Sequence, residues 1–548
     1  MNRELQVRHK QPPIMTKSSV YTLCLSLDTQ IVLEVKQSGL LGLGPPVIML
    51  AHTRTQSQGG VGKMAKKPNI VVIMTDQQRI DTVSAYEMNA IVKTPHIDGI
   101  AQRGVRFDGA FTPTAICSPA RASFYTGLYP HKHGVTGNGL CIKEGVRGVN
   151  QYLEKAGYRS GYAGKWHVDE ERGPSDYGFI GKDFIGYAFP GSGLLPGLQF
   201  GLPPKNSPNY YEEYLKENSY NPTVTSRYVG TNPGCQSQEM FALHNGPVES
   251  CIEYFVAEEA NNVIRELSGD DEPFFLWANF WGPHTPCLIP EPYFSMYDPT
   301  EIAEHPSYCE TFENKPQVQS IIERMWGLRD YGWKGFQEIA ARYYGHCTLI
   351  DDQVGRILKT LEETGQADNT IVIYTADHGD CLGAHKLIEK GEFMYDEIYR
   401  IPLIVSHPDC ANPGSVNDDF VYLQEITCSI IEAAGLEVPD HLDGQSFETA
   451  MRGDATPNGR EDVFCIFNNH FTTANQRMVR TRTHQFTFNP NDIGELYDLE
   501  KDPYQLDNRY GDPTYADVET DLKRRMGEHM VALGDPVHGW FRRMSPVY

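Results

Sequence analysis

Residues 69–77 read NIVVIMTDQ, an unbroken apolar run that ends in an acidic and an amide side chain. Three more short runs rich in β-branched or aromatic residues follow along the chain, at Tyr158–Gly164, Phe274–Phe280 and Ile371–Ala376. Continuous apolar runs of this length are typical of strands that are buried on both faces, as in a parallel sheet covered by helices. We therefore predict that the four runs form strands of one sheet.

Helical patterns separate these predicted strands. Ser250–Leu267 and Ala340–Glu363 repeat apolar residues at helical spacing, and Gly365 follows the second segment as a helix-ending residue. Alternation of strands and helices along a chain indicates an α/β fold. The expected architecture is a large mixed, mainly parallel sheet flanked by helices.

The chain divides into three predicted parts. Residues 1–63 show no clear periodicity and are interpreted as an N-terminal extension, disordered or wrongly assigned to the protein, because Met64 is followed at once by the first strand. Residues 64–458 hold the predicted main domain. Within them the stretch 170–248 is rich in Gly, Pro, Tyr and Asn, which indicates a long surface insertion that shapes the mouth of a pocket.

The last part, residues 459–548, has a different pattern. Short strand-like runs occur at Val463–Phe467 and Gln485–Phe488, and an amphipathic segment occupies Val518–Leu533. This pattern predicts a small α+β C-terminal subdomain.

The composition excludes several classes of protein. Of the 548 residues, 40% are hydrophobic and 22% are charged, which is the balance of a globular protein with a large core. The 48 Lys and Arg residues against 71 Asp and Glu residues give a formal net charge of −23, which argues against binding of nucleic acid or of an anionic membrane surface. No run approaches the roughly 18 apolar residues of a membrane span. An anionic substrate would therefore need a local basic site.

Cysteine usage and the N-terminal residues bear on the compartment. The 12 cysteines are scattered singly without a CxxC pair, as expected for reduced thiols in the cytoplasm. Residues 39–51, GLLGLGPPVIMLA, are the best candidate for the core of a signal peptide, but they start late, contain two prolines and lack a basic leader. We expect a cytoplasmic protein, with a secreted or periplasmic one as the alternative.

Polar side chains follow the predicted strands at their carboxyl ends, where open α/β sheets place their working residues. They are Asp76, Gln77, Lys165, Trp166, His167, Trp281, His284, Asp377 and His378. A single Asp after a strand is more often a helix cap than a metal ligand, but the joint presence of Asp76, Asp377 and His378 favours a divalent metal site. Oxygen-rich ligands favour Ca²⁺, Mg²⁺ or Mn²⁺ over a closed Zn²⁺ site.

The segment CSPAR, which begins at Cys117, is the most specific feature of the chain. Pro119 favours the first position of a helix with Ser118 as its cap, and Gly127 favours its end, which places Cys117 at the positive end of the helix. An isolated cysteine beside a helix is usually a small buried apolar residue, but Arg121, one turn away, adds a fixed cation. The segment therefore predicts that Cys117 lies beside a bound anion.

These residues resemble those of the type I sulfatases of the alkaline phosphatase superfamily. CSPAR fits their Cys-x-Pro-x-Arg modification signature, and Gly157–His167, GYRSGYAGKWH, fits their second signature. The opening PNIVVIMTDQQRID and the segments TPHIDGIAQRGVRF, YTADHGD and ELYDLEKDP extend the resemblance over nearly everything from Met64 onward. Because His378 follows Asp377 and Lys390 lies soon after in EKGEFMYDE, the nearer relatives look like the arylsulfatase and phosphonate monoester hydrolase branch.

Several assignments are implied by this resemblance. It implies an alkaline phosphatase-like fold, with residues 64–458 as the catalytic domain. It also implies that a formylglycine-generating enzyme converts Cys117 to formylglycine, whose hydrate is the nucleophile. The implied metal ligands are Asp76, Cys117, Asp377 and His378. The implied catalytic residues are Cys117, Arg121, Lys165, His167, His284 and Lys390: Arg121 and Lys165 hold the nucleophile, His167 is the base that regenerates the aldehyde, and His284 and Lys390 bind the sulfate oxygens and protonate the leaving oxygen.

Two polar residues near these positions have open roles. Asn138, in the TGNG loop after the cysteine helix, is a candidate substrate-binding residue for the sulfate, although a turn asparagine is the ordinary interpretation. Many sulfatases have a second Asp where this chain has Gln77. An amide oxygen can bind Ca²⁺ but adds no charge, so Gln77 is left out of the predicted ligand set. Ca²⁺ is the favoured metal, with Mn²⁺ and Mg²⁺ as alternatives.

For several other candidate residues, a role outside the site is more common than a role within it. His131 and His133 in YPHKHG could line the site, but a histidine in a surface turn usually has no special role. Tyr210, Tyr211 and Tyr214 form an aromatic cluster in the insertion that could stack on a ring of the substrate, with core packing as the alternative.

Three functions are compatible with these residues. The first is hydrolysis of organic sulfate monoesters, such as aryl, alkyl or sugar sulfates. The second is hydrolysis of phosphonate monoesters or phosphodiesters at the same centre. The third is a non-catalytic protein that binds sulfate or glycans, against which two proton-transfer groups and a modifiable cysteine argue. A homo-oligomer is left open.

Overall fold

The computed structural model describes residues 18–26, 29–36, 53–54, 66–184, 210–225, 241–455 and 459–545. The chain divides into two compact units, Met1–Lys66 and Lys67–Tyr548. The first unit contains a small antiparallel sheet of β1 (Ser18–Ser26), β2 (Thr29–Lys36) and β3 (Thr53–Arg54). This sheet was not predicted, because the alternation in segments such as TQIVLEVK is short. The candidate signal segment 39–51 lies outside the described residues, as do residues 185–209 and 226–240 of the predicted insertion.

The second unit is built on an eight-stranded sheet with the order β15-β5-β14-β13-β4-β11-β7-β8. Its strands are β4 (Asn69–Asp76), β5 (Val105–Phe107), β7 (Arg159–Lys165), β8 (Ile180–Phe184), β11 (Phe274–Pro283), β13 (Thr370–Ala376), β14 (Leu403–Ser406) and β15 (Ser415–Asn417). Only β14 pairs antiparallel with its neighbours; every other pair in this sheet is parallel. The mixed, mainly parallel sheet is therefore confirmed, and the four strands predicted from apolar runs are its adjacent members β13, β4, β11 and β7.

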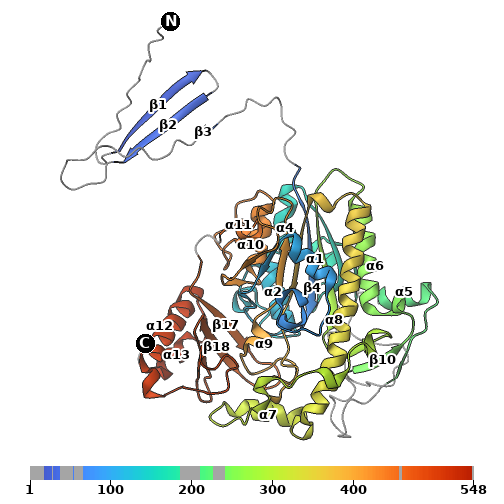
Figure 1. Ribbon diagram of the computed structural model, residues 1–548, viewed down its shortest axis with the longest axis vertical. Coiled ribbons are helices and arrows are strands. Elements are labelled where there is room, and N and C mark those ends of the chain that lie inside the picture. Colours follow the sequence, from blue (N-terminus) through green and yellow to red (C-terminus); the bar gives the residue numbers. More distant parts are fainter. Residues whose placement is uncertain are drawn as a thin grey trace, which may run out of the picture. The chain divides into compact units, whose positions relative to one another are not determined.

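Strand β4 shows why the central runs are apolar without interruption. Ile70, Val72 and Met74 belong to the apolar cluster that includes residues of α2 (Cys117–Thr126) and α10 (Glu425–Ala433). Val71 and Ile73 belong to the cluster that includes residues of α1 (Pro95–Arg103), α6 (Ile252–Leu267) and α8 (Gly332–Glu363). Figure 1 shows α6 and α8 running together along one side of this sheet. Because helices cover both faces, neither set of alternating residues meets water.

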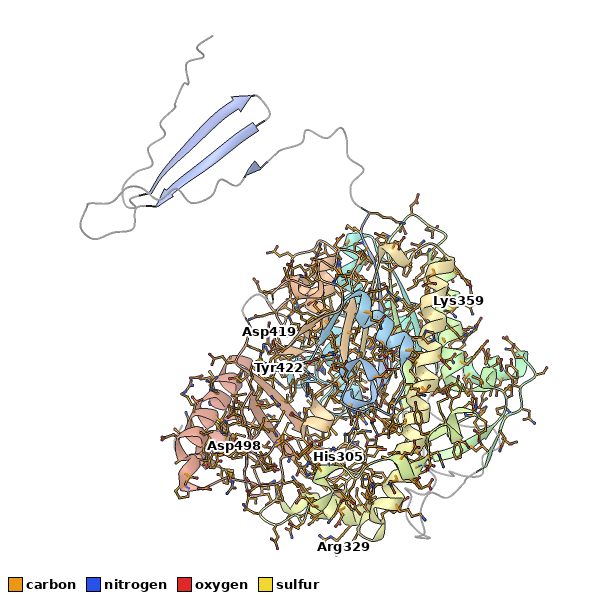
Figure 2. The ribbon with its side chains drawn as sticks, in the orientation of Figure 1. His305, Arg329, Lys359, Asp419, Tyr422 and Asp498 are labelled. Carbon is orange, nitrogen blue, oxygen red and sulfur yellow. The ribbon has the colours of Figure 1, made fainter. Side chains whose placement is uncertain are left out.

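The helix α8 begins eight residues before the predicted start at residue 340. Its first two turns read GWKGFQEI, and the two glycines weaken the helical signal there. Figure 2 places Lys359 on this helix. No helix among the described residues is both long enough and apolar enough to cross a membrane.

The C-terminal residues form a second, antiparallel sheet covered by helices. Its strands are β17 (Asp462–Asn468), β18 (Asn475–Thr481), β19 (His484–Phe488) and β20 (Glu495–Asp498), and the helices are α12 (Ala516–Leu533) and α13 (His538–Met544). Apolar residues of both layers, such as Phe464, Val479 and Met526, share one buried cluster. The small α+β C-terminal subdomain is confirmed (Figure 1), while its boundary at residue 459 stays a prediction.

Tyr422, labelled in Figure 2, lies where the C-terminal sheet meets the rest of the second unit. The Phe464 amide in β17 donates to the Tyr422 hydroxyl, and the Tyr129 hydroxyl donates to the Phe464 carbonyl at 2.9 Å. These bonds tie the two sheets into one compact unit, Lys67–Tyr548.

The remaining elements are short. The strands are β6 (Ala110–Phe111), β9 (Thr223–Thr225), β10 (Phe241–Asn245), β12 (Cys287–Ile289) and β16 (Val421–Tyr422), and the helices are α3 (Pro130–His133), α4 (Val149–Leu153), α5 (Tyr210–Glu217), α7 (Gln317–Met325), α9 (Asp396–Tyr399) and α11 (Glu448–Met451).

The tyrosines of α5 pack against α6 and not against a site. The ring centroids of Tyr211 and Tyr214 lie 5.6 and 5.3 Å from that of Phe255. The Tyr211 hydroxyl donates to the Ser250 carbonyl and the Tyr214 hydroxyl to the Glu249 carbonyl, each at 2.7 Å. All three tyrosines of the helix join the apolar cluster beneath it, so core packing is the correct interpretation.

Gly164, in β7, allows this strand to approach β11 closely. Its φ is +98°, and a Cβ there would lie 1.9 Å from the Asn279 carbonyl oxygen. We expect Gly164→Ala to lower the free energy of unfolding by about 3 kcal/mol or more, because overpacking adds to the strain of a positive φ. Urea unfolding followed by circular dichroism measures the loss. Gly157→Ala is the matched control, since Gly157 has a φ of +84° with nothing within 4 Å. Equal losses in the two variants would contradict the close-approach argument.

Candidate active site

Four side chains from separate segments meet at the carboxyl ends of the central strands. Asp76 ends β4, and Asp377 and His378 directly follow β13, its parallel neighbour. Cys117 is the first residue of α2. One potential ligand atom from each of the four lies within 4.8 Å of the others, and all four residues are buried. The structure therefore brings together the four predicted metal ligands, although their role as ligands stays a prediction.

Arg121 holds the two carboxylates of this cluster in place. It is fully buried, and its guanidinium donates to Asp377 Oδ2 at 2.9 Å and to Asp76 Oδ2 at 3.0 Å. A third donor reaches Asn279 Oδ1 at 2.8 Å. Lys165 also donates to Asp76 Oδ2, at 2.6 Å. The two cations thus bind the carboxylates directly; their predicted action on the nucleophile is not tested by this geometry.

The start of α2 differs from the prediction. The Ala120 amide donates to the Ile116 carbonyl at 2.9 Å, so Ile116 is the N-cap and Ser118 is the second helical residue. The prediction that Ser118 caps the helix and Pro119 opens it was therefore wrong. The helix starts two residues earlier than predicted because a residue outside the helix satisfies the Ser118 amide, which donates to Asn138 Oδ1 at 3.2 Å. The end at Gly127, with φ +71°, is confirmed.

The thiol of Cys117 lies among cations. Its Sγ is 3.2 Å from His378 Nε2 and 3.6 Å from Asp76 Oδ1. Burial opposes the thiolate, but Lys390 and Lys165 outweigh it and hold the pKa of Cys117 well below its usual range. The cations around Cys117 are consistent with the prediction that this residue lies beside a bound anion, which itself stays a prediction.

The two carboxylates affect each other. Burial and the charge of Asp76 raise the pKa of Asp377 to about 6. Burial also opposes the charged form of Asp76, yet Lys165 and Arg121 keep its pKa below the usual range. Burial disfavours the imidazolium of His378, but Asp377 and Cys117 outweigh it and raise the pKa of His378 to about 9. A bound cation would relieve the electrostatic repulsion between these two buried carboxylates.

Gln77 is tied to its neighbours through all its polar groups. Its backbone amide donates to Asp377 Oδ1 at 3.0 Å, and its side-chain amide donates to Asp380 Oδ2. Lys390 donates to Gln77 Oε1 at 2.6 Å. Asp380 therefore orients the Gln77 amide so that its oxygen faces Lys390. Asp380 was not predicted, because nothing in the sequence shows that an acidic residue two positions after His378 is buried.

Lys390 and His284 form a pair. Lys390 Nζ lies 2.8 Å from His284 Nε2 and donates to Glu389 Oε2 at 2.9 Å. His284 Nε2 is 3.9 Å from Asp76 Oδ1, and its ring centroid is 5.1 Å from that of Trp281. Burial opposes ionisation of Glu389, but Lys390 and His284 outweigh it and lower the pKa of Glu389 to about 2. Glu389 is a further residue that the sequence analysis missed, although it adjoins Lys390.

The predicted base, His167, lies beside Cys117. It follows β7 with a φ of 47°, and its side chain hydrogen-bonds Cys117. Burial lowers the pKa of His167, which favours the neutral imidazole that a base requires. His133 and His131 are engaged elsewhere: His133 Nε2 lies 3.1 Å from Ser123 Oγ, and His131 Nε2 lies 3.0 Å from the Leu533 carbonyl. Both histidines therefore have structural contacts, but they lie in α3 and not in a surface turn as predicted, and His133 is fully buried.

Comparisons with known proteins agree with this geometry. The family model described as Sulfatase matches residues 68–436, and the model described as N-sulphoglucosamine sulphohydrolase, C-terminal, matches residues 383–532. The chain is 27% identical over 494 residues to the sulfatase YidJ of Escherichia coli K12, with 88% of this chain and 90% of that protein aligned. It is 26% identical over 505 residues to an N-acetylglucosamine-6-O-sulfatase of Bacteroides thetaiotaomicron, with 84% and 86% aligned.

A solved structure is also similar to this chain over most of its length. The phosphonate monoester hydrolase of Agrobacterium radiobacter aligns with a TM-score of 0.69 and 26% identity, over 85% of this chain and 95% of that one. The fold, the buried cluster and these alignments define an enzyme that hydrolyses sulfuric esters. The chain belongs to the sulfatase family. This family generally uses a divalent metal and a formylglycine, and the clustered side chains described above form a possible metal-binding group.

The donor set fits a divalent metal. Asp76 and Asp377 supply hard carboxylate oxygens, and His378 supplies an imidazole nitrogen. We expect Asp76→Ala and Asp377→Ala to lose bound metal almost completely, whereas Gln77→Ala keeps most of it, because only the first two changes remove a charge. Metal analysis of the purified proteins checks this. If Gln77→Ala loses its metal as completely as Asp377→Ala, Gln77 is a ligand and its exclusion from the predicted set is wrong.

Proposed function

We propose that this enzyme hydrolyses organic sulfate monoesters to an alcohol and inorganic sulfate, with formylglycine derived from Cys117 as the nucleophilic residue. The observation that carries the proposal is the position of Cys117: it opens α2 within hydrogen-bonding range of His378 and His167, beside the two buried carboxylates. A formylglycine-generating enzyme is the partner that this residue needs during maturation.

Residue 117 carries the covalent chemistry. One hydroxyl of its hydrated aldehyde attacks the sulfur atom and loses its proton, while the bond from sulfur to the alcohol oxygen breaks and that oxygen takes up a proton. A sulfate ester on residue 117 and the free alcohol result. The second hydroxyl then gives its proton to His167, and the carbonyl re-forms as sulfate leaves. His284 and Lys390, whose side chains contact each other, together supply the proton to the departing alcohol oxygen in this proposal.

Ca²⁺ is the metal that we propose, with Mn²⁺ and Mg²⁺ as alternatives. The residues that would hold the metal are Asp76, Asp377, His378 and residue 117. The two carboxylates among them are hard oxygen donors, which suit Ca²⁺, Mn²⁺ and Mg²⁺ better than Zn²⁺ in a closed site. When bound, a divalent cation supplies positive charge that stabilises anionic oxygens.

Hydrolysis of phosphonate monoesters or phosphodiesters is the second candidate. It is favoured by the similarity to the phosphonate monoester hydrolase of Agrobacterium radiobacter, and tetrahedral oxyanions of sulfur and phosphorus need similar cations around them. Parallel assays with 4-nitrophenyl sulfate, a phenylphosphonate monoester and bis(4-nitrophenyl) phosphate separate the two. We expect the highest kcat/KM with the sulfate; a higher value with a phosphorus ester would make the second candidate the main activity. Binding of sulfate esters without turnover of any of the three would support the non-catalytic alternative.

We also propose a cytoplasmic location. All cysteines whose side chains the structure describes are free thiols, which suits a reducing compartment. Fractionation of the source cells tests this proposal, and recovery of the enzyme outside the cytoplasm would favour the secreted or periplasmic alternative.

A further inference from the structure

A hairpin of the C-terminal sheet reaches the edge of the active site. Residues 469–474 connect β17 to β18. The Asn469 carbonyl oxygen lies 3.8 Å from the position that a Cβ on Gly137 would take, and the Phe471 ring lies 3.6 Å from the corresponding position on Gly391. Each glycine adjoins a predicted substrate-binding residue in the sequence. The hairpin therefore bridges the two loops that carry those residues.

Specific contacts hold the hairpin there. The Phe471 ring meets that of Trp326 edge to face, with centroids 5.4 Å apart. The Thr472 amide donates to Glu392 Oε1 at 2.5 Å. Glu392 lies two residues after Lys390, so the hairpin is attached to the segment that presents this lysine.

His470, within the hairpin, lies among the charges of the active site. Its imidazole interacts electrostatically with Lys390, Cys117 and Glu389. Burial and then the Lys390 ammonium lower the pKa of His470 to about 4, so the imidazole is neutral at pH 7. The side chain is half-buried and makes no hydrogen bond or ion pair with the part of the chain that the structure describes. A neutral imidazole offers one donor and one acceptor.

We propose that His470 is a specificity-determining residue that hydrogen-bonds a hydroxyl group of the leaving alcohol and thereby selects sulfated sugars. The proposal rests on the sulfatase function proposed above. Because Lys390 pairs with His284, the predicted leaving-group acid, a side chain near Lys390 lies on the side of the departing alcohol. Asn469 precedes His470, and Asn138 adjoins Gly137, which lies near the Asn469 carbonyl. Both asparagines are exposed and add neutral donors and acceptors, the groups that hydroxyls require.

Steady-state kinetics with a panel of monosaccharide sulfates and with 4-nitrophenyl sulfate test the proposal, in enzyme whose formylglycine content has been verified. His470→Ala is expected to lower kcat/KM for the preferred sugar sulfate about 10-fold, the effect of one lost hydrogen bond. The rate with 4-nitrophenyl sulfate, which has no hydroxyl to bind, should change less than about 2-fold. His470→Gln keeps a donor and an acceptor and should retain most of the sugar activity.

Thr473→Ala is the matched control, because Thr473 is exposed in the same hairpin and should leave both rates unchanged. Equal losses with sugar and nitrophenyl sulfates in His470→Ala would overturn the proposal, since a purely structural residue affects both. A parent enzyme that hydrolyses 4-nitrophenyl sulfate but no sugar sulfate would also overturn it and leave the sulfatase function standing. A parent that hydrolyses neither class would overturn both.

Discussion

Cys117→Ser is expected to release at most one equivalent of alcohol per enzyme molecule and then stop. The variant can form a sulfate ester on its single hydroxyl, but it has no second hydroxyl whose proton loss re-forms a carbonyl and expels sulfate. Rapid mixing with 4-nitrophenyl sulfate measures the burst, and mass spectrometry of the peptide with residue 117 identifies the trapped ester. Cys309→Ser, at an exposed cysteine, is the control that should keep full turnover.

The parent protein gives the complementary result. Its peptide with residue 117 should carry an aldehyde or the corresponding hydrate in proportion to specific activity. A fully active preparation in which Cys117 is entirely unmodified would contradict the proposed nucleophile, whatever the variants show. Sustained turnover by Cys117→Ser would contradict it as well.

The sequence predicts the central sheet well because burial on both faces leaves a direct pattern. The run at 69–75 is apolar at every position that packs against α2 or α8, so no polar residue interrupts it. Boundaries were less accurate where local residues oppose the final structure. The glycines at the start of α8 conceal two helical turns, and the N-terminus of α2 depends on Asn138, a residue twenty positions away that no local pattern reveals.

The residues of the candidate site were likewise predicted where a local pattern marks them and missed where only long-range contacts do. Residues at strand ends were predicted because topology brings the ends of parallel strands together. Asp380, Glu389 and Asn279 were missed, since their role is to bind other site residues: they accept hydrogen bonds from Gln77, Lys390 and Arg121, respectively. His470 was missed because it lies in the hairpin between β17 and β18 of the C-terminal sheet, and the strand-end argument was applied only to the main sheet. Long-range packing, which a single sequence does not display, decides all four.

Charge balance explains why a cation belongs in this site. The chain carries a formal charge of −23. In the site, Arg121 and Lys165 both pair with Asp76. Arg121 also pairs with Asp377, and Lys390 pairs with Glu389. The cations of the protein are thus largely neutralised by its own carboxylates. Attraction for an anionic ester therefore requires further positive charge, which a bound divalent metal supplies.

His284→Ala is expected to slow hydrolysis of sugar or alkyl sulfates by roughly 10²–10⁴-fold, the usual effect of a lost proton transfer. Negative charge develops on the departing oxygen, and a general acid helps most when that oxygen is strongly basic. A nitrophenyl sulfate, whose anion is stable, should suffer much less. Rates across a series of leaving groups of graded basicity measure the difference as a change of slope.

The geometry adds a second requirement to this prediction. His284 Nδ1–H donates a hydrogen bond to the Thr285 carbonyl. Nε2 is therefore unprotonated and accepts a hydrogen bond from the Lys390 ammonium. The proton that reaches the alcohol oxygen is then shared by the pair, and Lys390→Ala should show the same dependence on leaving-group basicity. Removing both residues should cost little more than removing one, because groups that act as a unit are not additive. If His284 only packs against Trp281, the variant and the parent will give the same slope, and His284 is not the acid.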